Sequence, residues 1–196
     1  MSSVGWDLVQ SALRLRAPVL VDEPVRTRAA VAAVLREGRS GLELLLMRRA
    51  EHESDPWSGH ISFPGGRAEP GDDDLVATAV RETAEETGID LGRDAELLGR
   101  LDEVRAMARG RPVDLSITPF VFRLLRPADG TPNLEVVSLH WLPLARLLDP
   151  ECRSTMELRR GQSTLHPPCL RIDELVIWGL TLRMFDNLRG LVQAVA

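Results

Sequence analysis

Residues 64–89 read PGGRAEPGDDDLVATAVRETAEETGI, and this stretch decides both the fold and the chemistry of the chain. A Gly-Gly turn leads into an acidic loop, and the loop leads into an amphipathic segment that predicts a helix over 75–87. The aspartates at 72–74 are candidate N-caps, and their charge favours the N-terminal end of the helix dipole. Gly88 suits the position just past the helix.

Three carboxylates of this helix, Glu82, Glu85 and Glu86, stand at i, i+3 and i+4 and therefore share one face. Like charges at this spacing destabilise a helix, and a bound cation would relieve the repulsion. Taken alone, E-x-x-E-E is more typical of a solvated acidic face. The adjacent Arg81, which can pair with Glu85, the closing Gly88 and the upstream Gly-Gly turn together favour a metal site.

The chemistry of such a site follows from the hardness of its ligands. Mg²⁺ prefers carboxylate oxygens and often holds substrate phosphates as well. A backbone carbonyl of the Gly-Gly turn could approach the ion closely, because glycine has no Cβ in the way. A cation there would offset phosphate charge and lower the pKa of water, which indicates hydrolysis of a phosphoanhydride.

Composition bounds the remaining possibilities. The 196 residues are 44% hydrophobic and 27% charged, which predicts one soluble domain with its own core. A net charge of −5 argues against nucleic acid as the partner. No signal peptide or membrane-spanning run is evident, so we expect a cytoplasmic protein. All 24 basic residues are arginines and there is no tyrosine, which excludes lysine and phenol chemistry.

The remaining pattern predicts a mixed sheet between helical layers in a single domain over 1–196, with its core at about 28–191 and an N-terminal helix and connector over 1–27. We predict strands at 28–35, 42–48, 60–63, 96–101, 115–124, 135–142 and 169–172. Further helices are expected at 3–15, 144–148 and 175–195. Residues 50–59 and 105–111 are expected to be loops, and 150–168 irregular.

The helical segment resembles the signature of the Nudix hydrolase family, G-x5-E-x7-R-E-U-x-E-E-x-G-U, where U is a bulky apolar residue. The second half matches as RETAEETGI over 81–89, with Thr83 at a usually apolar position. In the first half, Gly66 lies one residue too far from Arg81. The family's first Glu therefore falls on Asp73 or a neighbour, and the role of that acid stays open.

The resemblance implies a Nudix fold, an α/β/α sandwich with a mixed sheet, and a bound Mg²⁺ or Mn²⁺. It makes Glu82, Glu85 and Glu86 the metal ligands, with the Gly66 carbonyl as a further one. Arg81 would brace the carboxylates, and Glu85, Glu86 and Arg81 would carry catalysis. The substrate would be a small nucleoside diphosphate derivative, hydrolysed by a monomer or a homodimer.

The lengthened loop is similar to the coenzyme A pyrophosphatase branch of this family. Its pattern F-P-G-G-R-x-x-P-x-D-x-D is present over 63–74, and IWGLT over 177–181 and the E-V-x-x-x-x-W-x-P-L pattern over 135–144 also match. The resemblance covers about 28–191. It implies cleavage of coenzyme A, or a derivative, to 3′,5′-ADP and a phosphopantetheine; ADP-ribose, dinucleotides and nucleoside triphosphates are the alternative substrates, and a non-catalytic nucleotide sensor is the alternative from another class.

One departure bears on the substrate. The branch usually has L-R-x-H-x-G-x-x-x-F-P-G-G ahead of the signature, but here the Arg and His are missing and Trp57 stands in the His position. Trp57 either stacks on an adenine ring or plugs the space under the loop. His60 either touches phosphate or makes a structural hydrogen bond.

Several residues outside the helix are candidates for the rest of the site. Arg67, Trp57 and Arg105 are the predicted substrate contacts. Arg105, Arg109 and Arg111 share one loop, which either grips phosphate or is an ordinary solvated loop. The catalytic base is sought among Glu103, Asp114 and Glu135, each of which also suits a strand end.

Overall fold

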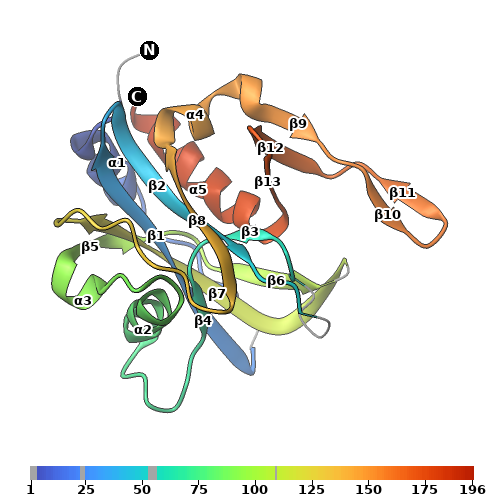
Figure 1. The fold of residues 1–196 in the computed structure, drawn as a ribbon, viewed down its shortest axis with the longest axis horizontal. Helices are drawn as coiled ribbons and strands as arrows, with labels where there is room; N and C mark the ends of the chain where they lie inside the picture. The colour runs from blue at the N-terminus through green and yellow to red at the C-terminus, as the bar shows by residue number, and fades with distance from the viewer. Residues whose placement is uncertain (1–3, 23–24, 53–56, 109) are drawn as a thin grey trace.

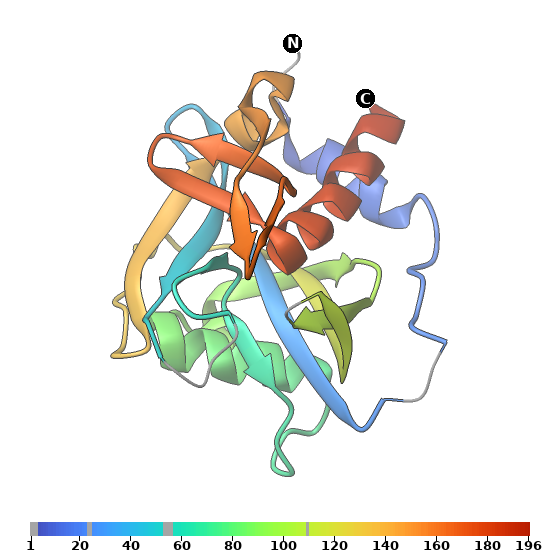
Figure 2. The same cartoon turned by 90° about the vertical axis from the view of Figure 1, so that its right-hand side faces the viewer.

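The computed structural model describes residues 4–22, 25–52, 57–108 and 110–196. Within these ranges eight strands form one mixed sheet at the centre of the molecule (Figures 1 and 2). They are β1 Thr27–Gly38, β2 Gly41–Arg49, β3 Ile61–Ser62, β4 Gly65–Arg67, β5 Ala95–Arg100, β6 Val104–Ala108, β7 Arg111–Leu124 and β8 Val136–Pro143. The main order is β3-β2-β1-β7-β5, with β8 on β2, β4 on β1 and β6 on β7. β1 and β7 run parallel, and the other pairs are antiparallel.

Helices cover both faces of this sheet. One face packs against α2 Leu75–Thr87 and α3 Leu91–Asp94, and the other against α1 Trp6–Arg14, α4 Leu144–Leu148 and α5 Gly179–Val195 (Figure 2). Alternate residues of β1 enter the two cores, so the strand is buried along most of its length. The predicted α/β/α sandwich with a mixed sheet is confirmed.

The C-terminal part of the chain adds a smaller sheet on the α5 side. It consists of β9 Arg153–Thr155, β12 Pro168–Ile172 and β13 Leu175–Trp178, and the short 3₁₀ helix Pro150–Cys152 precedes it. The hairpin β10 Leu158–Arg160 and β11 Ser163–Leu165 extends away from the body (Figure 1). No helix in the described ranges is both long and apolar enough to cross a membrane.

Segments with strong local signals lie where the sequence predicts them. The predicted helix over 75–87 is α2, residue for residue, and the strands predicted at 28–35 and 42–48 form the β1–β2 hairpin, closed at Gly38 and Gly41. The sequence also predicts Val76, Ala79, Val80 and Thr83 as the inward face of α2; Ala79 and Thr83 are buried, whereas Val76 and Val80 are only partly buried. The single-domain boundary over 1–196 stays a prediction.

Three predictions about loops and ends are wrong. Residues 105–108, expected in a loop, lie in the strand β6, which pairs antiparallel with β7 from Arg111 onward. Residues 150–168 contain three short strands rather than none. The closing helix begins at Gly179 and not at 175, because 175–178 pair with β12 and Gly179 turns the chain at a φ of 63°.

Candidate functional site

The acidic helix α2 is held at both ends by local contacts. The Asp74 side chain accepts a hydrogen bond from the Ala77 N–H at 2.8 Å, as an N-cap does. Gly88 ends the helix in the left-handed conformation, with a φ of 69°, and its N–H reaches the Ala84 carbonyl. These two contacts fix where α2 begins and ends.

Arg81 lies at the centre of a hydrogen-bond network behind the carboxylates. Its Nε and Nη2 donate to Asp72 at 2.9 and 3.0 Å, and its Nη1 donates to Glu82 at 2.9 Å and to Glu85 at 3.4 Å. The Arg81 guanidinium, above all, holds the pKa of Asp72 far below its usual range. The predicted brace therefore exists, and its main anchor is Asp72, an acid for which the sequence left the role open.

Glu82 and Glu86 are the buried members of the acidic face. The Glu82 side chain is 17% exposed and that of Glu86 is 4% exposed. Burial raises the pKa of both, that of Glu86 to about 7, although the Gly65 N–H donates to Glu86 at 2.8 Å and opposes the rise. Arg49 Nη1 lies 3.7 Å from Glu86. These two carboxylates are therefore desolvated and only partly compensated by the chain.

Glu85 differs from its two neighbours. Its side chain is 57% exposed, and its carboxylate lies 3.4 Å from Arg81 Nη1. Within the described ranges, no three His, Cys, Asp or Glu side chains converge closely enough to hold a metal ion. The expected set of three converging glutamates is thus two buried carboxylates and one exposed one, and the metal roles of all three stay predictions.

A cavity of about 790 Å³ lies in front of Glu82 and Glu86. Gly65, Gly66 and Arg67 of β4 line it on the polar side together with Arg49 at the end of β2. The backbone comes so close here that a Cβ on Gly66 would lie 2.4 Å from the Glu82 carboxyl carbon. Absence of a side chain at Gly66 is therefore what lets Glu82 face the cavity.

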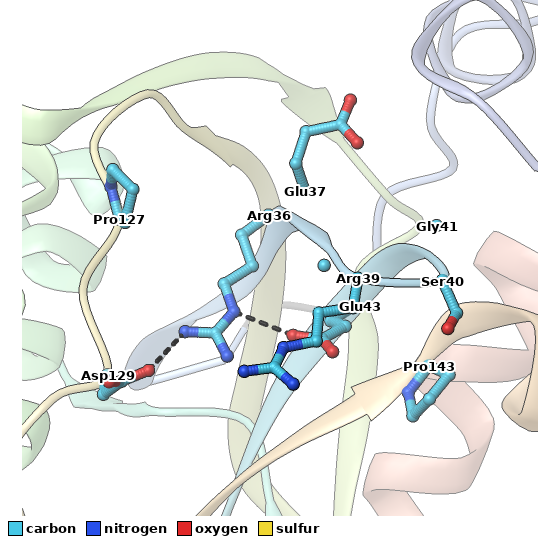
Figure 3. Close-up of a pocket in the computed structure, with 10 residues that line it drawn as sticks. Arg36, Glu37, Arg39, Ser40, Gly41, Glu43, Pro127, Asp129 and Pro143 are labelled. Atoms are coloured by element: carbon cyan, nitrogen blue, oxygen red, sulfur yellow. Dashed lines mark hydrogen bonds and ion pairs between the residues drawn. The ribbon is translucent and has the colours of Figure 1, made fainter.

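A second, smaller cavity of about 470 Å³ lies beside the β1–β2 turn (Figure 3). Its central Arg36 is paired with Glu43 at 2.9 Å and with Asp129 at 2.8 Å, and it lies over the Trp141 ring. Arg36 is thus already paired with two carboxylates, and no residue of the acidic helix α2 lines this cavity. The larger cavity is the candidate site.

Comparison with known proteins supports this choice. The family model of the NUDIX domain matches residues 26–158, which include the Gly-Gly strand and the whole acidic helix. This chain belongs to the Nudix family. The hydrolase class that the motif predicted, acting on phosphorus-containing acid anhydrides, is confirmed with the family.

Relatives of this Nudix chain include proteins with an assigned activity. The mouse mitochondrial coenzyme A diphosphatase NUDT8 is 33% identical over 164 residues, which cover 80% of this chain and 75% of the relative. An uncharacterised protein of Schizosaccharomyces pombe is 41% identical over 118 residues, but the chain spans only 36% of its length. The crystal structure of a Caenorhabditis elegans Ap4A hydrolase binary complex superposes with a TM-score of 0.51 at 25% identity, covering 62% of this chain and 83% of that one.

Only one of the three candidate bases faces the cavity. Glu135 lines it and raises the pKa of Glu86 through its charge. Glu103 instead accepts a hydrogen bond from the Val21 N–H, and Asp114 one from the Arg26 N–H, so both hold the N-terminal connector. Among these acids, the geometry leaves Glu135 as the candidate base.

The predicted substrate contacts divide in the same way. Arg67 and Trp57 line the cavity, and Trp57 Nε1 donates to the Met107 carbonyl at 3.2 Å. Arg105 lies in β6, where its Nε donates to the Val113 carbonyl, and it is not a lining residue. Arg111 is exposed at the start of β7, and Arg109 lies outside the described residues.

Several lining residues were not among the predicted site residues. Arg49 follows the apolar run of β2, and Trp178, Leu180 and Met184 come from the β13–α5 junction. His60 lines the cavity and packs against Trp178, with ring centroids 4.7 Å apart. The IWGLT pattern that matches the coenzyme A branch contains Trp178 and Leu180. The pattern does not indicate that these side chains line the cavity.

Proposed function

We propose that this Nudix chain is a metal-dependent coenzyme A diphosphatase, which cleaves coenzyme A or a derivative to 3′,5′-ADP and a phosphopantetheine. The observation that carries the proposal is the pair of buried glutamates, Glu82 and Glu86, facing one large cavity beside the Gly-Gly strand. The similarity to the mouse coenzyme A diphosphatase over 80% of this chain supports the substrate class.

The donor set fits a divalent cation of the Mg²⁺ or Mn²⁺ type. Mg²⁺ is usually held by one or two carboxylates, with water and substrate phosphates as its other ligands. Glu82 and Glu86 meet that requirement, and the missing Cβ of Gly66 leaves room at their side of the cavity. Glu85 would join them only after leaving Arg81. When bound, such a cation supplies positive charge that offsets the diphosphate and acidifies water.

The remaining residues have roles that follow from their places. Arg49 and Arg67 bring positive charge to the cavity wall and would bind and orient the diphosphate oxygens. Arg81, which is anchored by Asp72, donates to Glu82 and holds its carboxylate in place. Glu135 would accept the proton of the attacking water at its carboxylate.

A substrate panel tests the proposal. The purified protein with Mg²⁺ or Mn²⁺ is assayed on coenzyme A, ADP-ribose and diadenosine tetraphosphate, and the kcat/KM values are compared. Highest kcat/KM on coenzyme A supports the proposal. A higher kcat/KM on diadenosine tetraphosphate would make that compound the proposed substrate instead. It is the alternative that the similarity to the Ap4A hydrolase favours. No turnover of any compound by folded protein overturns the catalytic assignment. The cytoplasmic location stays a prediction from the sequence.

A further inference from the structure

The cavity has two walls of unlike chemistry. The polar wall is made by β4 and α2, with Glu82 and Glu86. The cavity is also lined by aromatic and aliphatic side chains, of which Trp57, Trp178, Leu180 and Met184 are here called the apolar wall. The last three belong to the β13–α5 junction, which lies beyond residue 158, where the family match ends. Most of the apolar wall therefore lies outside the matched family domain.

Two contacts hold this junction against the strand that leads into the Gly-Gly turn. The buried Thr181 hydroxyl donates to the Ile61 carbonyl at 2.9 Å, and the rings of His60 and Trp178 meet at 4.7 Å. Gly179, with a φ of 63°, turns the chain between Trp178 and the first turn of α5. Because β3 precedes the Gly-Gly strand directly, the apolar wall is held in a set position relative to the polar one.

The side chains of the wall suit a flat ring better than a flexible chain. The indole of Trp57 is oriented by its hydrogen bond to Met107, and that of Trp178 by its contact with His60. Rigid aromatic faces recognise planar partners by stacking. A nucleobase offers the flat face that such stacking needs.

We infer that Trp57 and Trp178, with Leu180 and Met184 beside them, form the nucleobase subsite of this enzyme and bind the adenine ring of its substrate. The inference rests on the proposed function for the identity of that substrate. It adds that the C-terminal segment from β13 into α5 determines specificity, and that the base lies on the apolar wall while the diphosphate lies at Glu82 and Glu86.

Binding of the two halves of coenzyme A tests this assignment. Calorimetry measures Kd for 3′,5′-ADP, which carries the base, and for 4′-phosphopantetheine, which does not. Trp178→Ala is expected to raise Kd for 3′,5′-ADP about 5- to 150-fold, the usual effect of losing one stacking partner, and to leave that of phosphopantetheine unchanged. Trp178→Phe keeps an aromatic face and should lose much less. Trp141→Ala, which removes an indole beside Arg36 outside this cavity, is the matched control.

The outcomes separate this inference from the proposed function. Unchanged 3′,5′-ADP binding in Trp178→Ala overturns the inference, and so does an equal loss for phosphopantetheine, which would place the other half on this wall. If Trp178→Ala does not fold, Trp57→Ala makes the same test and is judged by the same two Kd values. Trp178-dependent binding of AMP and 3′,5′-ADP without hydrolysis of coenzyme A would retain the subsite and reject the proposed substrate.

Discussion

Alanine at the two adjacent glycines of the Gly-Gly strand should have different effects. Gly65→Ala should lower the stability of the protein, and Gly66→Ala should lower its activity. At Gly65 the φ is 143°, and an added Cβ would lie 2.3 Å from the Ala30 carbonyl oxygen and 2.5 Å from the Val31 Cα. Both obstacles are backbone atoms of the central strand β1 and cannot move aside. At Gly66 the three nearest atoms all belong to the Glu82 carboxylate end, at 2.4–2.6 Å, which a change of rotamer can move away.

The magnitudes follow from these obstacles. Gly65→Ala combines a backbone conformation that L residues rarely adopt, at about 1–3 kcal/mol, with overpacking of about 1–3 kcal/mol. We expect a loss of about 2–6 kcal/mol and a fall in Tm of roughly 5–20 °C. Gly66→Ala should cost less than about 1 kcal/mol. It displaces Glu82 from the cavity, however, so kcat/KM should fall about 10- to 100-fold, as when the support of a metal ligand is lost.

Thermal unfolding and steady-state hydrolysis of coenzyme A with Mg²⁺ measure the two effects separately. Gly71→Ala is the matched control, since no atom lies within 4 Å of its added Cβ, and it should change neither quantity. A Gly66→Ala protein that keeps full activity would refute the placing of Glu82 at the reacting end of the cavity. A Gly65→Ala protein as stable as the parent would refute the argument from the β1 backbone.

Three further predictions follow from the same structure. Glu86→Gln should lower kcat/KM about 100-fold or more and abolish any rise of Tm with added Mg²⁺, because a cation's contribution of several kcal/mol is lost; unchanged turnover would contradict its role. Asp72→Asn should lower kcat/KM because it releases Arg81, and steady-state assays over a range of Mg²⁺ concentrations measure the change in kcat/KM and KM. An equal kcat/KM in the variant and the parent would exclude this supporting role of Asp72. Asp102, whose pKa is lowered chiefly by Arg16, contributes stability above its unfolded pKa of about 4. Asp102→Asn should therefore cost about 1–3 kcal/mol at pH 7, and chemical denaturation at successive pH values should show that cost vanish as pH falls through the lowered pKa; a pH-independent difference would contradict the ion pair.

Much of the fold was predictable where its signals are local. The helix α2 begins at an N-cap aspartate and ends at a left-handed glycine, so its bounds depend on residues within it or next to it. The β1–β2 hairpin likewise follows from two apolar runs and a glycine-containing turn. The strand β6 escaped prediction because the arginine-rich segment 105–111 resembles a loop, and only pairing with β7 makes 104–108 a strand.

The residues of the site were predictable as a motif but not as a geometry. Glu85 and Glu86 are neighbours in the sequence and carry the same functional group, yet one is exposed and the other buried. Successive helical positions differ by about 100° in direction, so the placing of β4 against α2 decides which carboxylate meets the cavity. The three candidate bases were equivalent as acids, and only the course of the N-terminal connector removes Glu103 and Asp114 from consideration.

The predicted Gly-Gly turn is instead the strand β4, which pairs with β1. By itself, then, the sequence determined the acidic helix and the Nudix family with its hydrolase class. Each of these depends on residue types at short, constant spacing. Only the tertiary structure decided that Asp72 anchors Arg81, that Glu135 alone of the candidate bases faces the cavity, and that Trp178 lies on it. The physical reason is that cavities are made by side chains far apart in the chain, whose positions depend on strand pairing and packing rather than on neighbouring residues.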